Sequence, residues 1–391
     1  MIDRATFVQA LAAAVAAPAT PPPAERSFNV LVLGDSIAWG QGLRPEHRWR
    51  TLLIDYLTKT LKQPVREIPT ELHSGAIIGI GDRNQIGLPG LYQPGETEPS
   101  FLDKGPYAGE IPSGTPTVLA ELDALDASPE KDTPIDLIVL SAGINDVRIT
   151  RLLDPLARDE YIAALIDLHC HRHLTALLDR IRTRCVERNP GCRVAVLSYF
   201  RMVSKDSTKF PSVYDFVSAL LSQPPRSRAE RRRERIIQGL AKISEGKHEA
   251  NTPYATYADL PEIVRGIIDA AGRFYAESEA AIGAAVDDAN RAPFTPAFVH
   301  VTPRISDGQA VFVAPPNSSS LWELRFADRA VFPVDEVYAE RDELCRQLYS
   351  PEKAPASLNE CRIASIGHPD VVGAQQGYFD AILAAIASVA R

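Results

Sequence analysis

FNVLVLGDS, residues 28–36, is the stretch that decides the fold of this 391-residue chain. A short apolar run, rich in branched residues and stopped by Gly34, is typical of a buried β-strand. Ser36 follows where the strand ends and a helix can begin, so its backbone N–H is free to point outward. A serine in such a turn can act as a nucleophile, and its N–H can help to hold an oxyanion. The alternative is an ordinary capped turn, because Gly-Asp-Ser is common in turns.

Four further strand candidates follow the first, and helical patterns lie between them. We expect strands at 65–69, 135–141, 193–199 and 297–301, and helices at 47–62, 115–126, 160–188, 258–290 and 371–390. Strands that alternate with helices pair in parallel, so the sequence predicts a three-layer αβα sandwich around a parallel sheet. Ligands of such sheets bind at the carboxyl ends of the strands. Ser36, Gly75 and Asn145 each follow a predicted strand, and we expect all three at that edge.

Three more segments complete a recognisable set of blocks. Gly75 lies in LHSGA, Asn145 in SAGIND and His368 in IGHPD. Together with the Gly-Asp-Ser block around Ser36, they resemble the blocks of the SGNH (GDSL) hydrolase superfamily, in particular its lipase-like esterases. The resemblance covers about residues 28–391. It implies a flavodoxin-like sandwich that hydrolyses carboxylic esters with no metal and no cofactor.

The resemblance assigns a role to each block. Ser36 would be the nucleophile, and His368 the general base that takes its proton and returns it to the leaving alcohol. The Ser36 N–H, the Gly75 N–H and the side-chain amide of Asn145 would hold the oxyanion. Glycine suits such a position because a backbone N–H must approach the substrate closely. Gly75 could also be an ordinary turn glycine, and Asn145 could serve its loop through local hydrogen bonds.

One position departs from the family pattern. The family usually has an aspartate three residues before the histidine, and this chain has Ser365 there. The group that orients His368 could be the Ser365 backbone carbonyl, the Ser365 hydroxyl or an acid from elsewhere, and we expect the carbonyl. The candidate acids are Asp335, Glu343 and Glu360. Two alternatives stay open: a carbohydrate O-deacetylase or acyltransferase on the same site, and a catalytically weak binding module that keeps the fold.

The bulk composition fits one catalytic domain with large insertions. Hydrophobic residues make up 45% of the chain, which is enough for a full core. We interpret residues 1–26 as a leader or tail, and 27–391 as the hydrolase domain with a large, mostly helical insertion at 201–292. Insertions at strand ends shape the substrate pocket or form a lid. With a net charge of −8, no global field attracts nucleic acid. We expect a monomer that binds a small-molecule or lipid ester.

The chain has no uninterrupted apolar stretch of about 18 residues, so we expect no transmembrane helix. Residues 7–17 are apolar and rich in alanine. They fit a signal peptide, with export to the periplasm or beyond, or an amphipathic helix before a proline linker. The basic run at 226–235 fits a solvated helix start or loop, with a docking patch for anionic lipid as the alternative.

The spacing of the five cysteines predicts two local disulfides if the protein is exported. The expected pairs are Cys185–Cys192 and Cys345–Cys361, with Cys170 free. Five reduced thiols would instead fit a cytosolic protein.

His169 and His173 share a helix face at four-residue spacing, which could bind a metal. No acidic third ligand is evident beyond Asp167, which lies on a different face. A structural or solvated helix face is therefore the expectation.

Overall fold

The computed structural model describes most of the chain from residue 26 onward. The described ranges are 26–80, 109–112, 116–147, 159–209, 256–291, 297–313, 319–327, 330–333, 335–349, 358 and 361–389. The predicted leader, the basic run at 226–235 and much of the predicted insertion lie outside them.

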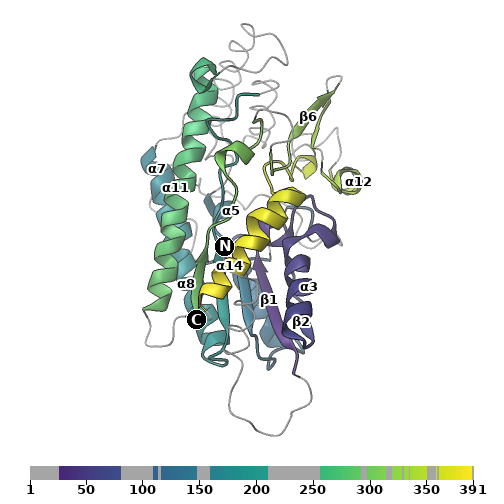
Figure 1. Ribbon diagram of the computed structural model, residues 1–391, viewed down its shortest axis with the longest axis vertical. Helices are drawn as coiled ribbons and strands as arrows, with labels where there is room; N and C mark the ends of the chain where they lie inside the picture. Colours follow the sequence, from purple (N-terminus) through teal and green to yellow (C-terminus); the bar gives the residue numbers. More distant parts are fainter. Residues whose placement is uncertain are drawn as a thin grey trace.

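A five-stranded parallel sheet forms the centre of the molecule (Figure 1). Its order is β2-β1-β3-β4-β5, and every neighbouring pair is parallel. The central strands β1 and β3 are buried along their whole length, as expected of strands that are covered on both faces. The predicted strands and their parallel pairing are confirmed. The bounds are β1 Phe28–Gly34, β2 Val65–Ile68, β3 Leu137–Ser141, β4 Arg193–Leu197 and β5 Phe298–Val301.

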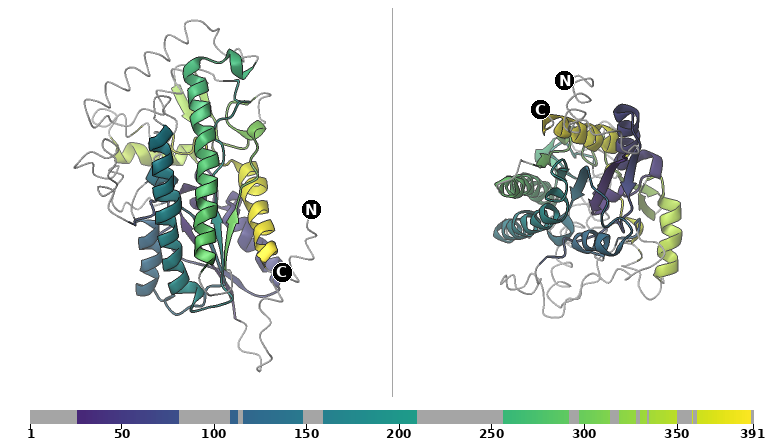
Figure 2. Two further views of the ribbon diagram at one scale, coloured as in Figure 1. Left: turned by 90° about the vertical axis from the view of Figure 1, so that its left-hand side faces the viewer. Right: turned by 90° about the horizontal axis from the view of Figure 1, so that it is seen from below.

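Helices cover both faces of this sheet, which confirms the three-layer sandwich. In Figure 2, α3 and α14 lie on one side of the sheet, and α4, α8 and α11 lie on the other. The bounds are α3 Trp49–Leu61, α4 Val118–Ala124, α8 Leu174–Ile181, α11 Glu262–Asn290 and α14 Asp380–Val389. Parallel strands need a crossover between them, and α11 is the crossover from β4 to β5. The later part of the predicted insertion thus contains a helix of the sandwich itself.

The helix predicted at 160–188 is one continuous helical stretch, in which two segments are π-helical. It runs through α7 (Asp159–Ile166), η4 (Asp167–His173), α8 and η5 (Arg182–Val186). π-Helical turns occur frequently at functional sites. Segment η4 packs behind the loop that follows β3, because a Cβ added at Gly143 would lie 3.2 Å from the Cys170 sulfur.

Two elements near the C-terminus have no counterpart in the sequence analysis. Strands β6 (Leu324–Ala327) and β7 (Ala330–Pro333) form an antiparallel hairpin, and helix α12 (Tyr338–Leu348) follows it. Both lie outside the strand–helix alternation that marks the strands of the central sheet. Within the described ranges, none of the helices combines the length and the apolar character that a bilayer span requires.

Cysteine pairing follows the prediction only in part. Cys345 and Cys361 form a disulfide with their Cα atoms 5.8 Å apart. Cys170, Cys185 and Cys192 are buried free thiols, so the predicted Cys185–Cys192 bridge is wrong. Burial raises the pKa of the Cys185 thiol to about 11 and that of Cys192 further still. Both thiols therefore stay protonated, and the reactive thiolate that forms disulfides is scarce.

Candidate active site

Ser36 is the first residue of α2 (Ser36–Trp39), a single helical turn directly after β1. The preceding Gly34 has a φ of +135°, and a Cβ there would lie 2.1 Å from the carbonyl oxygen of Ser141 in β3. Only glycine lets the chain turn this close to the neighbouring strand. The Ser36 N–H donates to none of the described residues, so it is free to face a ligand.

Asp35, a fully buried carboxylate, holds this turn through its hydrogen bonds. It accepts hydrogen bonds from the Ile37 N–H at 3.0 Å, from the Tyr199 hydroxyl at 3.0 Å and from the Ser141 hydroxyl. Burial nevertheless raises the pKa of Asp35 to about 6, against the effect of these donors. The hydrogen bonds fix the direction in which the serine leaves the strand.

Tyr199 joins the serine turn to the segment that carries Asn145. Its hydroxyl donates to Asp35 and accepts from the Ile144 N–H at 3.0 Å. The ring is buried, and it follows strand β4. Tyr199 could not be predicted from the sequence, because a tyrosine after a strand carries no local signal of such a contact.

The imidazole of His368 lies directly on Ser36. His368 Nε2 is 2.7 Å from Ser36 Oγ, although the two residues are 332 positions apart. Backbone pairing holds the histidine in place: the Trp322 N–H donates to its carbonyl at 2.8 Å, and Leu321 bridges to Pro369. The structure thus brings together the first and last blocks that the sequence analysis singled out.

Burial is the main influence on the His368 ring, and it lowers the pKa of His368 to about 4. The backbone carbonyls of Ser365 and Ile366 lie close enough to raise that pKa in part. Among the described residues, Nδ1 has no hydrogen-bond partner, and the Ser365 carbonyl accepts from the His368 N–H at 2.9 Å. At neutral pH the ring is uncharged, which is the form that accepts a proton.

The candidate acids lie in different places. The Ser365 hydroxyl donates to Asp335 at 2.5 Å. Asp335 therefore contacts the turn that carries His368 through Ser365. Glu343 is exposed on α12, where it accepts from Gln347. Glu360 lies outside the described residues.

Gly75 and Asn145 follow β2 and β3, the two neighbours of β1. Asn145, in α5 (Ile144–Val147), donates one amide N–H to the Ala76 carbonyl at 3.0 Å, and its second N–H remains available. Asp146 accepts from the Ile78 N–H at 3.0 Å. These two bonds hold the Gly75 loop against α5. Gly75 has a φ of +86°, which favours glycine, and its N–H donates to no described partner.

The remaining histidines of interest are part of the packing. His73 is 1% exposed, with its ring nitrogens 2.8 and 2.7 Å from the carbonyls of Ser74 and Pro116. His169 and His173 stack edge to face, with ring centroids 5.1 Å apart. In the ranges that the structure describes, no three His, Cys, Asp or Glu side chains are grouped so that they could hold a metal ion.

The fold and the Ser36–His368 contact define an α/β protein with a serine–histidine pair at the carboxyl edge of its sheet. The chain belongs to the GDSL-like lipase/acylhydrolase family, whose pattern matches residues 32–276, and it is a hydrolase of that family. Among curated proteins, none matches the chain.

Three solved structures are similar at low identity. The extracellular lipase from Streptomyces rimosus is 15% identical over 92% of this chain and 100% of that one, with a TM-score of 0.43. Phospholipase A1 from Streptomyces albidoflavus NA297 is 12% identical over 92% and 99%, with a TM-score of 0.40. A carbohydrate esterase is 11% identical over 64% and 69%, with a TM-score of 0.24.

Proposed function

We propose that the protein is a serine esterase that cleaves carboxylic esters of lipid-like or small-molecule substrates at Ser36. The observation that carries this proposal is the 2.7 Å contact between Ser36 Oγ and His368 Nε2. A neutral imidazole at this distance can accept the hydroxyl proton. Family membership supports ester hydrolysis in general.

The reaction begins when Ser36 Oγ attacks the carbonyl carbon of the ester and His368 Nε2 takes the serine proton. The tetrahedral oxyanion accepts hydrogen bonds from the Ser36 N–H, the Gly75 N–H and the free amide N–H of Asn145. His368 then gives its proton to the departing alcohol, which leaves an acyl-serine. Water, deprotonated by the same imidazole, releases the carboxylic acid and restores the serine.

The backbone carbonyl of Ser365 serves in place of the usual aspartate. Together with the Ile366 carbonyl, it raises the pKa of the His368 ring in part. In the free protein Nδ1 makes no hydrogen bond to a described residue, so this carbonyl accepts the Nδ1 proton only as the ring becomes charged. A neutral carbonyl stabilises the imidazolium less than a carboxylate does. We therefore place Ser365 in the catalytic machinery through its main chain.

Hydrolysis of p-nitrophenyl butyrate tests the proposal. Wild type should release p-nitrophenol, and Ser36→Ala should not. Ser128→Ala is the matched control, because Ser128 caps a turn through local hydrogen bonds and should leave the rate unchanged. Equal rates in wild type and Ser36→Ala would contradict the proposal and favour a binding module.

The substrate class follows from a second series on the same enzyme. We expect p-nitrophenyl esters of medium and long acids to be cleaved faster than acetylated sugars. Release of acetate from peracetylated glucose, with little activity on longer esters, would favour the carbohydrate O-deacetylase instead.

A further inference from the structure

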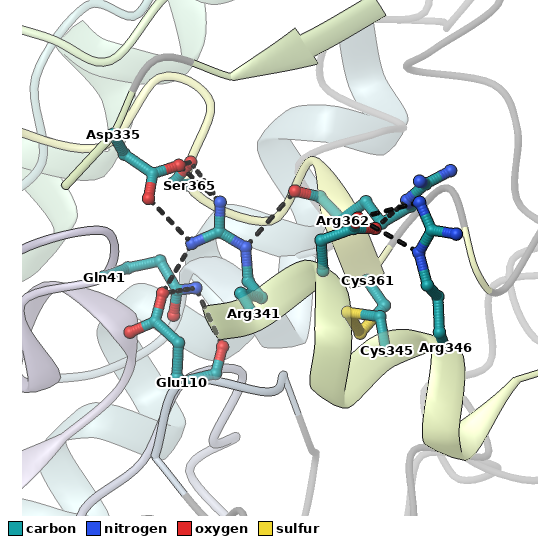
Figure 3. The surroundings of a disulfide bond; sticks show 10 residues. Gln41, Glu110, Asp335, Arg341, Cys345, Arg346, Cys361, Arg362 and Ser365 are labelled. Carbon is teal, nitrogen blue, oxygen red and sulfur yellow. Dashed lines mark hydrogen bonds and ion pairs between the residues drawn. A yellow bond between two sulfur atoms is a disulfide. The ribbon is translucent and has the colours of Figure 1, made fainter. Parts of the chain in front are cut away.

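Arg341 is a fully buried arginine whose five N–H donors are all used (Figure 3). It lies on α12. Its Nε donates to the Arg362 carbonyl at 3.2 Å, and its Nη1 to Glu110 at 2.6 Å and to Asp335 at 3.2 Å. Its Nη2 donates to the Ser365 hydroxyl at 3.0 Å and to Asp335. This set of acceptors fits the planar fork of a guanidinium, which an ammonium group cannot reproduce.

On one side, Glu110 connects this arginine to the turn that follows the Ser36 helix. Glu110 Oε1 accepts from the Gly42 N–H at 3.1 Å and from the Gln41 side-chain amide at 2.8 Å. Its other oxygen accepts from the indole N–H of Trp39 at 3.0 Å. The Gly42 turn also touches the histidine turn, because a Cβ on Gly42 would lie 2.9 Å from the Ser365 Cβ.

On the other side, Ser365 connects the arginine to the catalytic histidine. The Ser365 hydroxyl accepts from Arg341 and donates to Asp335 at 2.5 Å. Its carbonyl accepts from the His368 N–H at 2.9 Å. The side chains of Arg341 and Asp335 are both 0% exposed. An unbroken series of hydrogen bonds therefore runs from the serine turn to the histidine turn.

We propose that Arg341, with Asp335, is a positioning residue that sets the separation of Ser36 and His368 by locking their two turns together. The inference rests on the proposed serine esterase. The two turns come from opposite ends of the sequence, and a displacement of about 1 Å between reacting groups can cost about 100-fold in rate. A cluster that bonds both turns to one rigid guanidinium removes that freedom.

Stability alone is a weak explanation for this cluster. Buried ion pairs can often be replaced by apolar residues of similar volume with no loss of stability, since desolvation of the charges offsets their attraction. The planar guanidinium instead donates to Glu110 on one side and to Ser365 on the other. It thereby fixes the distance between the Gly42 turn and the Ser365 turn. Arg346, on the same helix, is by contrast an exposed arginine that pairs with Asp342.

Arg341→Lys and Ser365→Ala test the inference with p-nitrophenyl butyrate. Active sites are counted by titration with a fluorophosphonate, so that unfolded protein does not lower the measured kcat. Arg341→Lys keeps the charge and loses the fork, and we expect kcat to fall by about 10- to 100-fold with KM within about twofold of wild type. Ser365→Ala keeps the carbonyl and frees the turn, and we expect a loss of about tenfold in kcat alone.

Arg346→Gln is the matched control, since it removes an exposed arginine of the same helix that pairs with Asp342 and forms no hydrogen bond or ion pair with Arg341 or Ser365. Unchanged kcat per titrated site in both test variants would overturn the inference, and so would an equal loss in Arg346→Gln. If Arg341→Lys does not fold, Ser365→Ala decides alone. Failure of the proposed esterase shows differently, as a Ser36→Ala protein that is as active as wild type, and it would remove this inference as well.

Discussion

The Ser36 hydroxyl and the His368 imidazole exchange a single proton in the proposed reaction, so neither has a catalytic use without the other. Ser36→Ala and His368→Ala should each remove nearly the whole chemical rate, and the double variant should lose little more. Steady-state kcat of the three variants on one ester checks this prediction. Losses that multiply in the double variant would show that the two residues act independently.

In the proposed reaction Asn145 contributes one N–H to the oxyanion, while its other N–H donates to the Ala76 carbonyl. Asn145→Ala should lower kcat by about 10²–10³, the loss found when one oxyanion donor is removed. Asn189→Ala serves as the control, because its amide donates to the Ile135 carbonyl at 2.8 Å away from the site. That variant should lose stability and keep kcat. A normal turnover number in Asn145→Ala would remove this residue from the proposed site.

Ser36, Gly75, Asn145 and His368 could be predicted because each lies in a short block that resembles a block of the SGNH hydrolases. Tyr199 and Arg341 show no such pattern. Tyr199 meets Asp35 across 164 positions, and Arg341 meets Glu110 across 231. Contacts of this kind exist only once the sheet and the C-terminal segment are in place, so a reading of local motifs misses them.

Among the helices and strands, those with a clear hydrophobic pattern in the sequence could be predicted. Strands β1 and β3 are continuous apolar runs, and the alternation with helices fixes their parallel pairing. Strands β6 and β7 are as short as β2 and β5, but they lie outside the alternation with helices that marked those two strands. The π-helical segments η4 and η5 lie in a pattern that reads as ordinary helix. The acid next to Ser365 was one of three candidates in the sequence, and the fold places Asp335 there.

The Cys345–Cys361 disulfide joins α12, which carries Arg341, to the segment that leads to Ser365. It closes a loop of 16 residues, for which the chain-entropy account gives about 3 kcal/mol of stability. Cys345→Ser together with Cys361→Ser should lower the free energy of unfolding by about that amount and should also lower kcat. Urea unfolding and ester hydrolysis measure the two effects.

Thiol titration of unfolded, unreduced protein gives the control for the disulfide prediction. It should find three free thiols, those of Cys170, Cys185 and Cys192. A count of five would show that the bridge does not form. A double variant with normal kcat would show that the bridge does not support the site.

For the molecule as a whole, strand order brings the loops of the candidate active site together. Strands β2, β1 and β3 are neighbours, so the loops after them, which carry Gly75, Ser36 and Asn145, leave the same edge side by side. The C-terminal segment lies at the same edge and places His368 against Ser36. Burying titratable groups here couples the site to the stability of the whole fold, and the coupling has opposite signs for His368 and Asp35.

Acidification should weaken the fold through His368. Burial lowers its pKa from 6.5 to about 4 in the folded protein. Between these values the unfolded state binds the proton more readily, so stability is lost as the pH falls from about 6.5 to 4. At pH 5 this loss in the free energy of unfolding amounts to about 1–2 kcal/mol. Urea unfolding at pH 7 and pH 5 should show that wild type loses this amount relative to His368→Gln, and a constant difference between the two proteins would contradict it.

Asp35 should act in the opposite direction. Burial raises its pKa from 3.8 to about 6 in the folded protein. Above pH 6 the carboxyl is ionised in both states, and the folded state carries the cost of the buried charge. As the pH falls from about 6 to 4, the folded protein takes up a proton that the unfolded chain does not, so wild type gains stability relative to Asp35→Asn. The gain should approach about 3 kcal/mol. Unfolding free energies of both proteins across this range test the sign directly, because a wild type that loses stability relative to Asp35→Asn on acidification would require the Asp35 pKa to be lowered rather than raised.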